Sequence, residues 1–90
     1  MEVLTIGYIT FIKLSQIKKK KTDDIKLFNK DTEACLGEIK WFPAFRKYSY
    51  FPAAGIVLDA KCLDVISKYL NDLNLKYKKD NLKGSDVKEN

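Results

Sequence analysis

Apolar and polar residues alternate in several short stretches of this chain, a spacing typical of β-strands. The alternation predicts strands at about residues 24–29, 34–42 and 46–51, and a further edge strand at 8–14 is open. The stretches between them are rich in residues that favour tight turns, notably Asn29 to Thr32 and the segment after Pro43. The pattern therefore predicts a three- or four-stranded antiparallel β-meander.

A different periodicity follows at about residues 60–75, where apolar residues recur at steps of three and four. Such a stripe is the mark of an amphipathic helix that packs on a sheet. The stripe consists of Cys62, Leu63, Ile66, Tyr69, Leu70 and Leu73. Asp59 is a favourable N-cap, and Leu58 and Leu63 have hydrophobic-staple spacing. We expect an α+β fold in one compact domain over residues 1–77, with a flexible charged tail over 78–90.

The two faces of the predicted sheet differ in chemistry. Trp41 is the expected core anchor, and Tyr48 and Tyr50 have the parity to pack beside it. Gly37 leaves a gap on that inward face, which indicates a bulge or the close approach of another element, here the helix. The strand at 46–51 has apolar residues on both sides, so its periodicity leaves the core face open. If Trp41, Tyr48 and Tyr50 pack inward, the outward face is basic and aromatic. It then carries Lys26, Phe28, Lys40, Phe42 and Lys47, with Phe45 as a further candidate, and the candidate binding set also includes Arg46, the only arginine.

Positive charge points to an anionic partner. The chain has a formal net charge of +5, and residues 15–24 form a predicted loop that contains a run of four lysines. This run is either a solvated connection or a contact for phosphate groups through Lys19, Lys20 and Lys21. Exposed aromatic rings next to cations can stack on nucleobases while the cations neutralise phosphate. Nucleic acid is therefore the first expected partner.

Two other interpretations of the aromatic residues stay open. In one, the strand at 8–14 covers them, which would give the small domain a core on both sides of the sheet. In the other, they form a docking patch for a protein, since aromatic residues and arginine are favoured at interfaces. A salt titration separates nucleic-acid binding from protein binding.

Candidate chemistry is sparse. The chain has no histidine, and its two cysteines, Cys35 and Cys62, fall at predicted core positions where thiols are inert. We therefore expect no enzyme activity, no cofactor and no metal site. The cysteines are expected to be free, with a disulfide between strand and helix as the alternative. The apolar N-terminus is too short to span a membrane and lacks the basic residues of a signal peptide, which favours a cytoplasmic location.

One combination of residues resembles a family of small proteins found in phages and prophages. The combination is Gly-x-Ile-x-Trp-Phe at 37–42, Arg-x-Tyr-x-Tyr-Phe-Pro at 46–52 and Cys-Leu-x-x-Ile at 62–66, and the resemblance covers about residues 26–73. This chain departs from the usual pattern at Phe45, where the family tends to have tryptophan, and at 56–58. The resemblance implies a phage protein in the host cytoplasm and supplies no catalytic residues.

A phage setting adds further functional alternatives to nucleic-acid binding. The protein would inhibit a host protein, such as a defence protein, through the aromatic patch, or it would sequester a nucleotide in a pocket at a homodimer interface. The leading hypothesis remains a small binding protein for an anionic partner, and nucleic acid is placed first.

Overall fold

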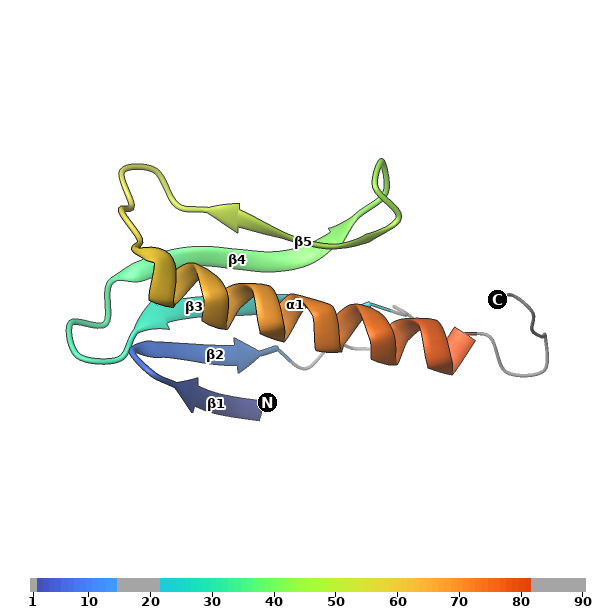
Figure 1. Ribbon diagram of the computed structural model, residues 1–90, viewed down its shortest axis with the longest axis horizontal. Coiled ribbons are helices and arrows are strands. Elements are labelled where there is room, and N and C mark those ends of the chain that lie inside the picture. The colour runs from blue at the N-terminus through green and yellow to red at the C-terminus, as the bar shows by residue number, and fades with distance from the viewer. Residues whose placement is uncertain (1, 15–21, 82–90) are drawn as a thin grey trace.

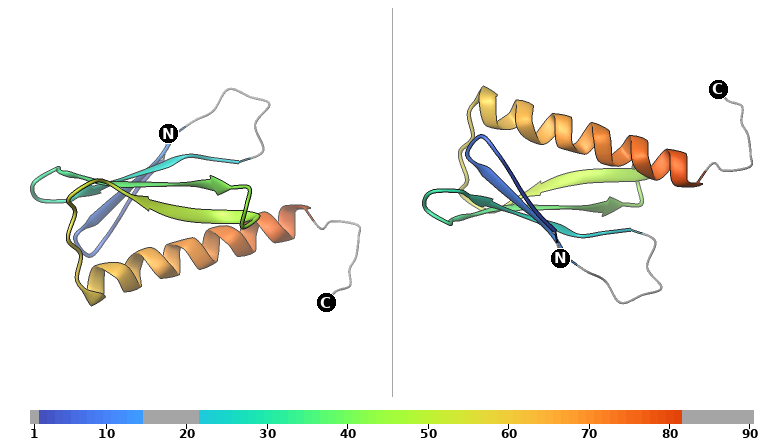
Figure 2. Two further views of the ribbon diagram at one scale, coloured as in Figure 1. Left: turned by 90° about the horizontal axis from the view of Figure 1, so that it is seen from above. Right: turned by 90° about the horizontal axis from the view of Figure 1, so that it is seen from below.

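The protein is a single antiparallel sheet with one helix on one of its faces (Figures 1 and 2). The computed structural model describes residues 2–14 and 22–81. The strands are β1 (Glu2–Ile6), β2 (Ile9–Lys13), β3 (Ile25–Asn29), β4 (Cys35–Phe42) and β5 (Lys47–Pro52), and the helix α1 spans Ala60–Asn81. The strand order in the sheet is β1-β2-β3-β4-β5, a meander in which every pair is antiparallel. The predicted α+β class is confirmed, although the sheet has five strands.

The strand missing from the prediction is β1. The apolar N-terminal stretch divides into two strands at Gly7 and Tyr8, and Ile6 pairs with Ile9 across this two-residue turn. Gly7 has a φ of 61°, a backbone conformation that glycine adopts without steric cost. The strand expected at 8–14 is therefore the second half of a hairpin. It lies beside β3 within the sheet, so the alternative in which it covers the aromatic residues is wrong.

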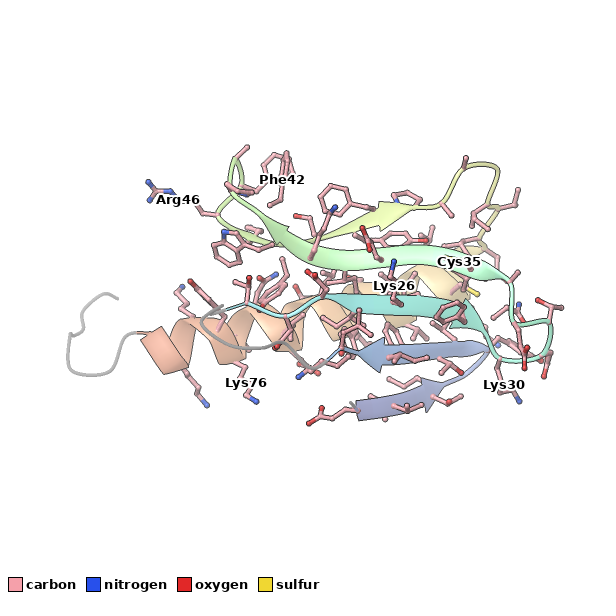
Figure 3. All side chains as sticks on the ribbon, turned by 180° about the vertical axis from the view of Figure 1, so that it is seen from behind. Lys26, Lys30, Cys35, Phe42, Arg46 and Lys76 are labelled. Carbon is pink, nitrogen blue, oxygen red and sulfur yellow. The ribbon has the colours of Figure 1, made fainter. Side chains whose placement is uncertain are left out.

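The connection between β4 and β5 holds Arg46 outside the strand. Residues 43–46 form the turn, and the Arg46 N–H donates to the carbonyl oxygens of Phe42 (2.9 Å) and Pro43 (3.1 Å). Arg46 has a φ of 55°, which closes the turn and lets the chain re-enter the sheet at Lys47. The expected strand start at residue 46 is thus wrong by one residue, and Arg46 extends from the end of the hairpin (Figure 3).

A bulge in β4 changes which side chains face the helix. Leu27 pairs with Gly37 and Phe28 with Cys35, so Leu36 is an extra residue in β4 and is buried. The sequence left a bulge or a close approach open at Gly37, and the structure has a bulge at the neighbouring Leu36. The element that approaches Gly37 is β5, so the expected approach of the helix is wrong. A Cβ at Gly37 would overlap the carbonyl oxygen of Phe51 and lie 2.9 Å from Cα of Pro52.

The bulge also displaces Cys35 from the core. Strict alternation places Cys35 on the inward face, whereas the structure exposes it and leaves Cys62 half-buried, with both thiols free. The expectation that both cysteines are core residues is therefore wrong, and no disulfide joins them. Burial raises the pKa of the Cys62 thiol, and the nearby Asp59 carboxylate adds to that shift.

The core lies between the sheet and α1. Its largest fully buried side chains come from the three central strands, β2, β3 and β4, and the helix contributes the buried residues Ile66 and Leu73. The ring of Phe11 on β2 stacks on Tyr69 of the helix at a centroid distance of 4.1 Å. Trp41, the expected anchor, packs against this core but is only half-buried. The largest fully buried side chain is Phe11 instead.

The helix begins as predicted and ends later. The backbone N–H of Cys62 donates to Asp59 Oδ1 at 3.0 Å, which confirms the N-cap. Leu63 is 50% exposed, so it does not belong to the buried stripe. The helix continues past the expected end at residue 75 to Asn81, because Tyr77 extends the stripe and packs on Trp41. The assignment of 78–81 to a flexible tail is wrong, and residues 82–90 lie outside the described chain.

Candidate nucleic-acid interface

The face of the sheet opposite α1 carries most of the predicted site. Strand pairing aligns Lys26 of β3, Glu38 of β4 and Phe51 of β5 in one row across the sheet. Lys40 pairs with Ser49 in the next row, and Phe42 lies at the end of β4. Figure 3 shows this face, with Lys26 and Phe42 labelled. We call it the open face and define it by Lys26, Phe28, Glu38, Lys40, Phe42, Phe45 and Phe51.

Three phenylalanines form a connected cluster on the open face. Phe42 contacts Phe45 and Phe51 edge to face, with centroid distances of 4.8 Å and 5.7 Å. The Lys40 ammonium lies 4.9 Å from the centre of the Phe51 ring, within the range of a cation–π interaction. Phe45 is 63% exposed, so a partner can contact its ring without disturbing the core. Phe51 was not among the predicted site residues. The only feature of the sequence that indicated its place on this face was its even spacing from Lys47 in the same strand.

Glu38 lies between the two lysines at the centre of the open face. Its carboxylate oxygens are 3.2 Å from Lys26 Nζ and 3.1 Å from Lys40 Nζ. Hydrogen bonds from Lys40, and then from Lys26, lower the pKa of Glu38, so the carboxylate is charged at neutral pH. One carboxylate thus offsets part of the charge of two lysines. Glu38 was not among the predicted site residues, although its two-residue spacing from Lys40 places both side chains on one face of the sheet.

The remaining predicted residues divide between three places. Phe28 lies on the open face but makes no ring contact with any described aromatic residue, so it is separate from the phenylalanine cluster. Arg46 and Lys47 lie at the end of the β4–β5 hairpin and both line a groove beside the helix, although Lys47 pairs with Phe42 and so has the parity of the open face. Neither of them forms an ion pair with a described residue. Lys19, Lys20 and Lys21 lie outside the described residues.

Other kinds of site find little support in the described part of the chain. Residues 2–14 and 22–81 contain no group of three side chains that could hold a metal ion. Within those same ranges, no helix is both long enough and apolar enough to cross a membrane.

The fold defines a class of small α+β proteins in which a five-stranded meander packs on one C-terminal helix and leaves the other face open. The chain is 41% identical over 73 residues to the uncharacterized 9.3 kDa protein of Acholeplasma phage L2. The aligned region covers 81% of this chain and 92% of the phage protein. The chain therefore belongs to the family of that phage protein, which confirms the predicted relationship to a phage protein family. No protein-family model and no solved structure matches the chain.

Proposed function

We propose that this phage-type protein binds single-stranded nucleic acid on the open face and has no enzyme activity. The observation that supports the proposal most directly is the cluster of Phe42, Phe45 and Phe51 with the Lys40 ammonium beside it. Aromatic rings on a sheet stack on bases of any sequence, and cations within reach neutralise the backbone. This arrangement matches both requirements.

The rows of side chains indicate where the parts of a bound strand would lie. Bases would stack on the phenylalanine cluster, which extends along β4 and β5 from the hairpin to Phe51, while phosphates would lie beside it on Lys26 and Lys40. Lys47 pairs with Phe42 and adds a further cation at the hairpin end of this face. A double helix hides the faces of its bases, so a single strand is the better fit to a stacking surface.

The test is a salt titration of binding to a fluorescein-labelled dT oligonucleotide, measured by fluorescence anisotropy. Each phosphate contact with a single strand contributes about −0.7 to the slope of log K against log salt concentration. The double variant Lys26→Gln/Lys40→Gln should therefore bind more weakly and lower the magnitude of the slope by about 1.4. Phe45→Ala should weaken binding by about 5- to 100-fold and leave the slope unchanged, because stacking carries no charge.

Lys61→Gln is the matched control, because Lys61 is an exposed lysine on the helix, away from the open face. It removes one positive charge and should leave both affinity and slope close to those of the parent protein. Absence of binding to the oligonucleotide at low salt would exclude the proposed function. Equal losses from Lys61→Gln and from a single Lys40→Gln variant would mean that binding follows net charge and not this face.

A protein partner is the second candidate function, and Glu38 favours it. A face that combines both signs of charge with exposed aromatic rings suits a protein surface as well as a polyanion. Capture from host lysate with the parent protein and with Phe45→Ala as bait addresses it. A host protein retained only by the parent, in the absence of nucleic-acid binding, would place this candidate first.

A further inference from the structure

A groove on the other side of the sheet has a composition that the proposed function does not use. It lies between the end of the β4–β5 hairpin and the C-terminal half of α1 and has a volume of about 600 Å³. Small-molecule sites in proteins occupy about 300 to 1,000 Å³. The residues of interest are Trp41, Arg46, Lys47, Leu75, Tyr77 and Lys78.

One part of the groove is aromatic. Trp41 and Tyr77 contact each other at a centroid distance of 4.5 Å with their planes 36° apart, and both are half-buried. Each ring therefore packs on the core and still exposes part of its surface. Leu75 adds an exposed apolar side chain from the helix. A planar ring of a ligand would gain stacking and apolar contact on such a surface.

The other part of the groove is cationic. Arg46 and Lys47 come from the hairpin and Lys78 from the helix, and none of the described residues that line the groove is acidic. None of the three cations forms an ion pair with a described residue. Lys78 also lies in the last turn of α1, where it offsets the negative end of the helix dipole. Because Lys47 pairs with Phe42 and has the parity of the open face, Arg46 carries most of the attraction for an anion in the groove.

Arg46 is the cation whose backbone is held in the turn. Its backbone N–H donates to two carbonyl oxygens of the turn, and the side chain extends outward from the hairpin end (Figure 3). A guanidinium binds phosphate through paired hydrogen bonds, which a lysine cannot match. A phosphate held there would lie beside the ring surface of Trp41 and Tyr77.

We propose that this groove binds a nucleoside phosphate, with the base against Trp41 and Tyr77 and the phosphate on Arg46. The site goes beyond the proposed function, since it lies on the helix side of the sheet and does not depend on the open face. The ligand is either a free nucleotide or the phosphorylated end of a strand, which present the same chemistry.

The chain supplies its own reporter for this site, because Trp41 is its single tryptophan. Titration with AMP should change the tryptophan fluorescence and saturate. Adenosine, which lacks the phosphate, and ribose 5-phosphate, which lacks the base, should each bind at least about tenfold more weakly, since each supplies one half of the recognition. Calorimetry of the same three compounds gives the affinities independently of fluorescence.

The decisive variant is Arg46→Asn, because asparagine tolerates the positive φ of this position and removes the guanidinium. It should weaken AMP binding by about tenfold or more, the value of a charge-assisted contact. Lys30→Asn is the charge-matched control, since Lys30 lies at the opposite end of the molecule (Figure 3) and should leave AMP binding unchanged. Competition by a 5′-phosphorylated oligonucleotide, and not by the same oligonucleotide with a 5′-hydroxyl, would identify a strand end as the source.

The proposal fails if AMP binds in neither measurement, or if Arg46→Asn and Lys30→Asn weaken AMP binding equally. These outcomes are separate from a failure of the proposed function. Oligonucleotide binding that depends on Lys26, Lys40 and Phe45 would stand without any effect of AMP. Conversely, AMP binding that depends on Arg46 would stand if no oligonucleotide bound to the open face.

Discussion

Gly37 combines two constraints that no other residue type can meet. Its φ is 129°, a region of backbone space that side chains exclude, and the backbone of β5 lies directly against it. The sequence indicated a special position here, because glycine inside a strand often marks a bulge or a close approach. It did not indicate which element approaches, since that depends on the pairing of Gly37 with Pro52 across the sheet.

We predict that Gly37→Ala destabilises the protein by about 3 kcal/mol, because it adds steric overlap with Phe51 and Pro52 to an unfavourable φ. Gly55→Ala is the matched control. Gly55 also has a positive φ, 76°, but nothing lies within 4 Å of its added Cβ, so the cost should be only about 1–2 kcal/mol. Urea denaturation of both variants measures the difference, and equal losses would show that overlap with β5 contributes nothing.

Cys35 illustrates why the parity of side chains fails next to a bulge. Counting by two from Trp41 and Ile39 places Cys35 inward, but the extra residue Leu36 reverses the faces before Gly37. Leu36 is buried and Cys35 exposed as a result. Counting in steps of two along a strand therefore assigns side chains to the correct face only as far as the first bulge.

At the level of elements, β5 is an edge strand whose outer side is closed by the helix. The Tyr48 N–H donates to Asn74 Oδ1 at 2.7 Å, and Asn74 Nδ2 donates to the Tyr48 carbonyl oxygen at 3.3 Å. The amide of Asn74 thus replaces the backbone of a sixth strand at this point. At Tyr48, this cover occupies two of the hydrogen-bonding groups through which edge strands pair with other chains.

We predict that Asn74→Ala lowers the free energy of unfolding by about 1–3 kcal/mol, since it leaves two half-buried backbone groups of Tyr48 without partners. Asn71→Ala, one helical turn earlier and exposed, should change it by no more than about 0.5 kcal/mol. Urea denaturation and exchange of the Tyr48 amide hydrogen are the measurements. An unchanged exchange rate in Asn74→Ala would contradict the proposed closure of the edge.

Elements were predictable where local pattern and tertiary contacts agree. Alternation located β3, β4 and β5 to within a residue or two, and Asp59 located the start of α1. β1 was missed because the apolar N-terminal stretch reads as one run, and only the conformation of Gly7 divides it. The helix end was missed because three lysines surround Tyr77, which holds the last turns by its contact with Trp41.

For the whole molecule, the sequence predicted the kinds of residue on each face better than their charge balance. The open face has the basic and aromatic residues that alternation assigned to it. Its net charge is lower than expected, because Glu38 shares the face with Lys40, and the register between β3 and β4 also places it opposite Lys26. The register between two strands depends on the geometry of the loop that joins them, which alternation of apolar and polar residues does not give. Neither the pairing of Glu38 with Lys26 nor the groove beside Arg46 could therefore be predicted from that alternation.

Glu38 gives the most direct test of how charge on the open face is used. In the free protein its carboxylate holds both Lys26 and Lys40, and a phosphate that takes their place must do so next to a negative charge. Two like charges about 4 Å apart repel by about 1 kcal/mol in water. The Glu38→Gln variant keeps the shape of the side chain and removes this repulsion.

We predict that Glu38→Gln binds the dT oligonucleotide about fivefold more tightly at low salt, with the advantage shrinking as salt rises. The loss of two surface ion pairs should reduce stability by no more than about 1 kcal/mol, so the gain can be measured on folded protein. Asp72→Asn on the exposed side of the helix makes the same change in net charge and should give little or no gain. Weaker binding by Glu38→Gln would instead mean that the carboxylate holds the two lysines in the position that binds phosphate, which would contradict the predicted repulsion.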